Sequence, residues 1–107
     1  MSLDFHISHS SREAERQHPV FSIEELIHAL LVQSANSAAT PIKLIARIED
    51  FYSDAEFLTK EIDELIIELR MLEGKTADEG TLRVVHDLLR ICEKTLNAKA
   101  NLYVFCD

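Results

Sequence analysis

The chain is poor in the residues that interrupt regular structure. Its 107 residues include two glycines, two prolines and no tryptophan. This scarcity excludes a loop-dominated or disordered chain and favours long regular elements. It also excludes a glycine-rich phosphate-binding loop, and no serine lies in a nucleophile-elbow motif. The two cysteines, Cys92 and Cys106, lack metal-ligand spacing and a disulfide-rich context, so we expect free thiols in a reducing compartment.

Long apolar runs are missing as well. No stretch approaches the roughly 20 residues that a helix needs to cross a bilayer. The opening residues MSLDFHIS have neither the basic nor the apolar region of a signal peptide. The length fits one domain, residues 1–107, and an apolar fraction of 47% with 28% charged residues is typical of a globular protein. We therefore expect a soluble, cytoplasmic, single-domain protein.

Hydrophobic periodicity predicts most of the regular elements. Residues 3–7 alternate apolar and polar side chains, which indicates a short strand. Residues 21–34 read as a helix, in which Ser22 and Glu25 form a capping-box pattern. The apolar stripe of this helix, which we expect to face the core, consists of Ile23, Leu26, Ile27, Leu30 and Leu31. Residues 59–73 and 82–96 carry leucine-rich stripes at helical spacing, with Thr59 as the cap of the first, and we expect them to form an antiparallel hairpin. The last run, NLYVFCD, is apolar on both faces, which favours a central strand or one covered by a partner.

The stretch PIKLIARIEDFY, residues 41–52, decides the fold class. As a strand, Ile42, Leu44, Ala46 and Ile48 would face inward, and this clean alternation favours a strand. As a helix, it would begin at Pro41, the position at which proline is favoured. The strand gives the order β-α-β-α-α-β. We thus predict a small α+β domain with a helical hairpin on a short three-stranded sheet; the helix would give a mostly α-helical bundle.

The acidic charge is concentrated in one segment. The whole chain has a net charge of −8, with 19 acids and 11 bases. Residues 49–79 hold eleven of the acids and three of the bases, which gives −8, so the remaining eight acids and eight bases cancel. Such a charge disfavours nucleic acid or an anionic membrane as a ligand, and it favours a basic protein partner. The alternative interpretation is a solvated helix face.

The run EDFYSDAEF, residues 49–57, begins this segment. Ser53 and Glu56 fit a capping box, with Tyr52 and Phe57 at its hydrophobic-staple positions, so we expect a turn that orders an acidic, partner-facing surface. Aromatic residues among carboxylates are common anchors of interfaces. The candidate partner-binding residues are Glu49, Asp50, Tyr52, Asp54, Glu56, Phe57, Glu61, Asp63, Glu64 and Glu68.

The histidines do not form a recognised metal motif. His6, His9 and His18 lie near one another in the sequence, but no acid or cysteine completes a ligand spacing, so we expect exposed side chains. His28 is expected to face solvent. We predict no metal, no cofactor and no enzymatic activity; a small metal-dependent enzyme that uses these histidines is a less favoured alternative.

The stretch YSDAEFLTKEIDELI, residues 52–66, is similar to part of the colicin DNase immunity proteins, in which an aromatic-acid-Ala-Glu-Phe-Leu run opens a helix. The resemblance implies a cytoplasmic inhibitor that binds a toxin domain, often a basic nuclease. Those proteins are all-α, and their Asp-Ser-Pro-Ser-Gly motif is absent here, so their fold and binding residues do not carry over. The leading hypothesis is a non-catalytic protein of the immunity or inhibitor type. The alternative is a structural or regulatory module that forms homodimers, for example through an edge strand LYVF.

Overall fold

The computed structural model describes residues 2–37, 44–48, 50 and 52–106. Its strands are β1 (Ser2–Ser8), β2 (Phe21–Glu24), β3 (Ala55–Phe57) and β4 (Asn101–Cys106). Its α-helices are α1 (Ser11–Ala14), α2 (Glu25–Ser37), α3 (Ile62–Lys75) and α4 (Glu79–Asn97), and two 3-10 helices are η1 (Ile45–Ile48) and η2 (Thr59–Glu61). The α+β class and the order β-α-β-α-α-β are confirmed by β1, α2, β3, α3, α4 and β4, while α1 and β2 are short additions. Within the described residues, no helix has the length and apolar character needed to cross a membrane.

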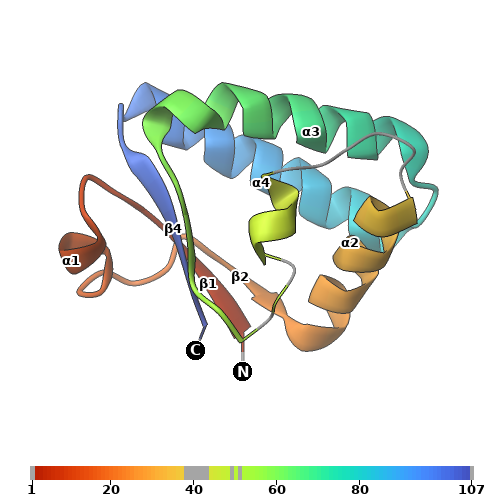
Figure 1. Ribbon diagram of the computed structural model, residues 1–107, viewed down its shortest axis with the longest axis horizontal. Coiled ribbons are helices and arrows are strands. Elements are labelled where there is room, and N and C mark those ends of the chain that lie inside the picture. The colour runs from red at the N-terminus through yellow and green to blue at the C-terminus, as the bar shows by residue number, and fades with distance from the viewer. Residues whose placement is uncertain (1, 38–43, 49, 51, 107) are drawn as a thin grey trace.

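The strands form one antiparallel sheet in the order β2-β1-β4-β3, so it has four strands where three were expected. Leu3 pairs with Cys106 and Phe5 with Val104, which aligns β1 and β4 along their whole length. Figure 1 shows α3 and α4 side by side on one side of the strands and α1 on the other. The central position predicted for β4 is confirmed. β4 lies between β1 and β3, and β3 pairs with residues Leu102–Val104, so this part of β4 offers no free edge for pairing with a second copy.

The core lies between the sheet and the helices. Alternate residues of each strand face it, including Leu3, Phe5, Phe57, Leu102 and Val104, and each of these side chains is at most 1% exposed. The predicted apolar stripes of α3 and α4 form the opposite side of the core. Its buried members include Ile62, Leu65, Leu69, Leu72, Val85, Leu89 and Cys92. The apolar side chains whose spacing predicted α3 and α4 are therefore the ones that hold this hairpin against the sheet.

The start of α2 differs from the prediction. Residues 21–24 are strand β2, and the hydroxyl of Ser22 donates to Asp4 Oδ1 at 2.7 Å, so the capping box is wrong. Pairing with β1 delays the helix, which alters the face that it buries. Leu26 is consequently 72% exposed, whereas His28 is only 5% exposed and its Nε2 lies 2.5 Å from the Ile48 carbonyl oxygen. The expectation that His28 faces solvent is wrong.

The described part of PIKLIARIEDFY is not a strand. Residues 41–43, 49 and 51 lie outside the described residues, and residues 45–48 form η1. The carboxylate of Glu68 accepts hydrogen bonds from the backbone N–H groups of Leu44 and Ile45, each at 3.0 Å. These donors are satisfied by a side chain, so they need no neighbouring strand. The strand next to β4 comes instead from Ala55–Phe57.

The run EDFYSDAEF forms the expected turn, but a strand follows it where the capping box indicated a helix. Asp50 accepts from the Tyr52 backbone N–H at 2.9 Å and from the Ser53 hydroxyl at 2.8 Å, which closes the turn. The chain then extends into β3, where Phe57 is 1% exposed. The capping box of Ser53 with Glu56 is therefore wrong.

The α3 region begins through other contacts than those predicted. Glu61 accepts from the Leu58 backbone N–H at 3.0 Å, and the Thr59 hydroxyl donates to the Ala100 carbonyl. Thr59 therefore ties the helix to the start of β4 and does not cap it. At the other end of the hairpin, Asp78 caps α4 by accepting from the Thr81 backbone N–H at 2.8 Å.

Candidate functional site

The predicted partner-binding residues do not form one surface. Phe57 is in the core, and Glu49 lies outside the described residues. Glu56 is on the outer face of the sheet, opposite Tyr103, whereas Asp63 and Glu64 are exposed on α3, which packs on the inner face. Tyr52 is 61% exposed, and its hydroxyl donates to Glu25 at 3.3 Å. The sheet thus separates the acids of β3 from those of α3.

Several of these acids have local structural partners. Glu68 holds the start of η1, and Asp50 closes the turn before β3. Glu61 receives two hydrogen bonds from Arg47, whose guanidinium also lies over the Phe57 ring, 5.5 Å from its centroid. The Arg47 hydrogen bonds, followed by the one from the Leu58 N–H, lower the pKa of Glu61 to about 2. These acids stabilise the fold, and they are poorly placed to serve as a shared binding surface.

The outer face of the sheet gathers aromatic side chains. Tyr103 and Phe105 of β4 point away from the core, and their rings stack with centroids 6.3 Å apart. The His6 ring of β1 lies beside Phe105, with 5.1 Å between centroids. Phe105 is half-buried, while Tyr103 and His6 are buried. The second apolar face predicted for β4 is therefore an aromatic row on the side of the sheet opposite α3 and α4.

A hollow of about 360 Å³ lies on this face. It is lined by Asp4, His6, Glu15, Gln17, Pro19, Asp54, Phe105 and Cys106. A second hollow of about 230 Å³ adjoins it, because Asp54 and Phe105 line both, and Glu56 and Tyr103 line the second. We call the two together the outer-face hollow. The volume of its larger part, about 360 Å³, is at the lower end of the range for ligand pockets. Four carboxylates surround its aromatic residues: Asp4, Glu15, Asp54 and Glu56.

Two of these carboxylates are held in position by one oxygen each. Asp4 Oδ1 accepts from the hydroxyls of Ser2 and Ser22, both at 2.7 Å. Asp54 Oδ1 accepts from the Cys106 backbone N–H at 2.8 Å. Within the described part of the chain, the second oxygen of each carboxylate has no hydrogen bond. Both are therefore oriented acceptors with unused capacity.

His6 is the unusual member of the hollow. Its side chain is 5% exposed, and among the described residues its Nδ1 is a buried polar atom without a hydrogen-bond partner. Burial lowers the pKa of His6, and the nearby Asp4 carboxylate opposes that shift only in part. The imidazole is therefore neutral at pH 7. Because most buried polar atoms in native proteins are paired, a histidine nitrogen without a partner at a hollow points to a missing group.

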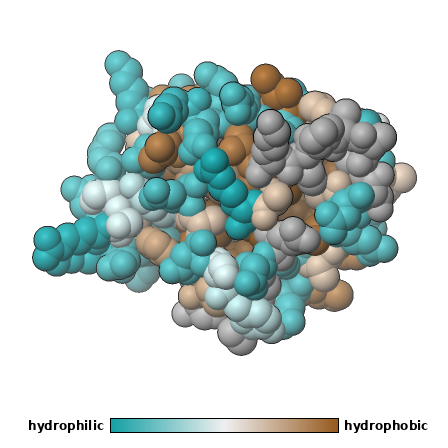
Figure 2. Space-filling model, viewed as in Figure 1, coloured by the Kyte–Doolittle hydropathy of each residue, from teal (hydrophilic) through white to brown (hydrophobic). Residues whose placement is uncertain are grey.

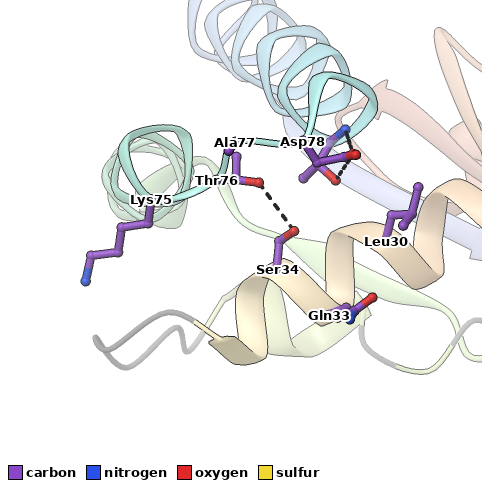
Figure 3. A pocket seen from close by; sticks show the side chains of 8 residues that line it. Leu30, Gln33, Ser34, Lys75, Thr76, Ala77 and Asp78 are labelled. Carbon is purple, nitrogen blue, oxygen red and sulfur yellow. Dashed lines mark hydrogen bonds between the residues drawn. The ribbon is translucent and has the colours of Figure 1, made fainter.

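A further hollow of about 360 Å³ lies between α2 and the α3–α4 turn (Figure 3). Its polar groups already serve the fold: Ser34 and Thr76 share a hydrogen bond of 3.5 Å, and Asp78 caps α4. The Lys75 side chain extends away from it in Figure 3. This hollow offers a ligand no unused buried polar group among the described residues.

The described histidines and cysteines form no metal site, and Cys92 is not a reactive thiol. His9 and His18 are exposed as expected, whereas His6 is buried and lines the outer-face hollow, so the expectation of an exposed side chain is wrong for His6. The described residues contain no group of three histidine, cysteine, aspartate or glutamate side chains that could hold a metal ion. Burial raises the pKa of Cys92 to about 12, so its thiol is not a nucleophile at neutral pH.

The coloured residues on the face seen in Figure 2 form no large apolar patch. Hydrophilic side chains predominate there, and the coloured hydrophobic side chains form small separate groups. Such scattered groups are ordinary on a protein surface. Comparison of the chain with family models, curated proteins and solved structures finds no match. The outer-face hollow is thus the candidate site on physical grounds.

Sequence reasoning found Asp54 and Glu56 but missed the rest of this site. The signal was present in the alternation of residues 2–8, which places Asp4 and His6 on one face of β1. It was also present in the second apolar face of NLYVFCD, which holds Tyr103 and Phe105. Glu15 gave no such signal, since it follows α1 in a segment without periodicity.

Proposed function

We propose that the protein is a non-catalytic binding protein that holds a basic protein partner at the outer-face hollow. The observation that carries the proposal is the combination of four rim carboxylates with the aromatic row of β4. Carboxylates at a rim attract and orient a basic partner, while aromatic side chains provide the contacts that anchor an interface. Unused acceptor oxygens on Asp4 and Asp54 suit donors supplied by lysine or arginine.

The finer proposal is an inhibitor of the immunity type, which acts in the cytoplasm and neutralises a basic toxin domain such as a nuclease. Two observations support it. The net charge of −8 comes entirely from residues 49–79, which include Asp54 and Glu56. Residues 52–66 are similar to a stretch of the colicin DNase immunity proteins. Inhibition would follow from covering basic residues that a nuclease uses to bind phosphates.

Two matched charge reversals test the location of the site. In the hollow variant, Glu15→Lys and Glu56→Lys replace two rim acids; in the helix variant, Asp63→Lys and Glu64→Lys replace two exposed acids of α3. Both variants change the net charge equally, so unspecific attraction is the same in each. The candidate partner is the protein encoded next to this one, and its affinity is measured by calorimetry at low and high salt.

We expect the hollow variant to weaken binding at least about tenfold, and the helix variant to weaken it much less. Added salt should weaken the wild-type complex because rim charges are screened. Equal losses of affinity in the two variants would show that binding depends on overall charge, and they would refute the hollow as the site. A neighbouring protein that does not bind would refute the immunity assignment, and failure of every basic protein tested would refute the broader proposal.

A further inference from the structure

We infer that the group which fills the outer-face hollow is an arginine side chain of the basic partner. The inference rests on the proposed function and specifies the residue by which the partner is recognised. In this arrangement the guanidinium lies against Phe105. It donates hydrogen bonds to the carboxylates of the hollow and to His6 Nδ1. Three features of the hollow select this group over an ammonium.

The first feature is the number and spread of acceptors. Asp4 comes from β1, Glu15 from the end of α1, and Asp54 from the residue before β3, so the carboxylates approach the hollow from separate elements. Asp4 and Asp54 each keep one oxygen without a hydrogen bond in the described part of the chain. A guanidinium has five N–H donors in a planar fork and can serve several acceptors at once, whereas an ammonium is a compact point charge.

The second feature is the flat aromatic row. Phe105 lines both parts of the hollow, and the rings of His6 and Tyr103 both lie beside it, with centroids 5.1 and 6.3 Å away. Arginine stacks on aromatic faces through both cation–π attraction and planar contact, and it is more weakly hydrated than lysine. A half-buried ring between carboxylates therefore favours a guanidinium, whose plane can lie on the ring while its edges reach the acids.

The third feature is His6. Its neutral ring lines the hollow and carries one acceptor nitrogen, and Nδ1 has no partner among the described residues. A half-turn of the ring exchanges Nδ1 with Cδ2 without changing the outline of the side chain. His6 can thus offer its acceptor to a donor in the hollow without disturbing its contact with Phe105. This pairing would remove the cost of a buried nitrogen that none of the described residues satisfies.

The test uses three short peptides of one design: acetyl-Gly-Arg-Gly-amide, its lysine counterpart and its citrulline counterpart. Citrulline keeps the shape of arginine without the charge. Binding is followed by NMR titration of the whole protein, with the imidazole nitrogens of His6 and the ring protons of Phe105 as local reporters. The variants are His6→Leu, which removes the acceptor, and Phe105→Leu, which removes the flat ring. His9→Leu is the matched control, since His9 is exposed.

We expect the arginine peptide to bind at least about tenfold more tightly than the lysine peptide, with a shift of His6 Nδ1, and citrulline to give no saturable change. His6→Leu and Phe105→Leu should each reduce this preference, whereas His9→Leu should leave it unchanged. Equal binding of the arginine and lysine peptides at the hollow would overturn the inference but leave the proposed function standing. Arginine-dependent shifts confined to α3, or none at all, would also overturn the inference; the charge-reversal experiment then decides the proposed function separately.

Discussion

The imidazole of His6 lies against the ring of Phe105, with 5.1 Å between their centroids, on the face of the sheet opposite the core-facing neighbours Phe5 and Val104. The two residues come from adjacent strands, β1 and β4, whose pairing joins the two ends of the described chain. In this contact the polar ring of His6 is almost completely buried. The protein thus holds an acceptor that none of the described residues satisfies.

Replacing His6 should therefore not weaken the fold. We expect His6→Leu to leave the free energy of unfolding unchanged or to raise it by about 1 kcal/mol, because the substitution removes an unpaired buried nitrogen. Urea denaturation measures the change. His28→Leu is a matched control, since both histidines are 5% exposed but His28 Nε2 bonds the Ile48 carbonyl oxygen. That variant should lose about 1–3 kcal/mol. Equal destabilisation by both substitutions would contradict the expectation that the hydrogen bond of His28 stabilises the fold and that His6 lacks such a contribution.

The pair Arg47–Glu61 makes stability depend on pH. The pKa of Glu61 falls from 4.5 to about 2 on folding, so its contribution is complete above about pH 4.5 and disappears as the pH drops toward 2. The two side chains are 39% and 21% exposed, so solvent screening reduces the contribution to about 1 kcal/mol. The stability gap between wild type and Arg47→Met should accordingly be present at pH 7 and shrink by pH 3.

Urea titrations at both pH values measure that gap. Asp50 and Asp78 also have lowered pKa values, but wild type and variant share them, so their effects cancel in the difference. Arg70→Met is the control, because Arg70 is exposed on α3 and the substitution changes the net charge equally. A gap that stays constant between the two pH values would show that Arg47 acts through its packing on Phe57 and its hydrogen bond to the Glu56 carbonyl, and not through the charge of Glu61.

Glu68 should be more important for stability than its neighbour one turn earlier. Its carboxylate accepts the backbone N–H groups of Leu44 and Ile45, which otherwise begin η1 without partners. We expect Glu68→Ala to lower the free energy of unfolding by about 1–3 kcal/mol. Glu64→Ala, on an exposed position of the same helix, should change it by no more than about 0.5 kcal/mol. Thermal and urea unfolding give both values. Similar losses of stability in the two variants would contradict the role of Glu68 in joining α3 to the start of η1.

Local periodicity sufficed for the parts of the fold that are stabilised locally. The stripes of α3 and α4 repeat within single helices, and residues such as Leu65, Leu69 and Val85 are buried as predicted. The start of α2 could not be predicted in this way, because Ser22 is held by Asp4, eighteen residues away, in β1. Tertiary pairing overrides a local capping pattern when it satisfies the same polar groups.

The site was predicted only where its charge was visible. Asp54 and Glu56 lie in the acidic segment, and both line the outer-face hollow. Asp4, Glu15 and Phe105 come from three other segments, and only the order β2-β1-β4-β3 brings them together. Glu61 and Glu68 show the converse: their sequence positions suggested a surface, but each is engaged by backbone or arginine donors. Charge in a sequence does not reveal which donors the fold will supply.

The face that α2 buries gives a final prediction. Leu26 is 72% exposed and Leu31 is 0% exposed, although the predicted stripe placed both in the core. We expect Leu26→Ala to change the free energy of unfolding by about 0.5 kcal/mol or less, because little apolar surface leaves the core. Leu31→Ala should cost about 2–5 kcal/mol, because it leaves a cavity beneath the sheet. Chemical denaturation compares the two identical substitutions on one helix. A large loss at Leu26 would mean that the helix begins at Ile23 and buries the face that the sequence pattern first indicated.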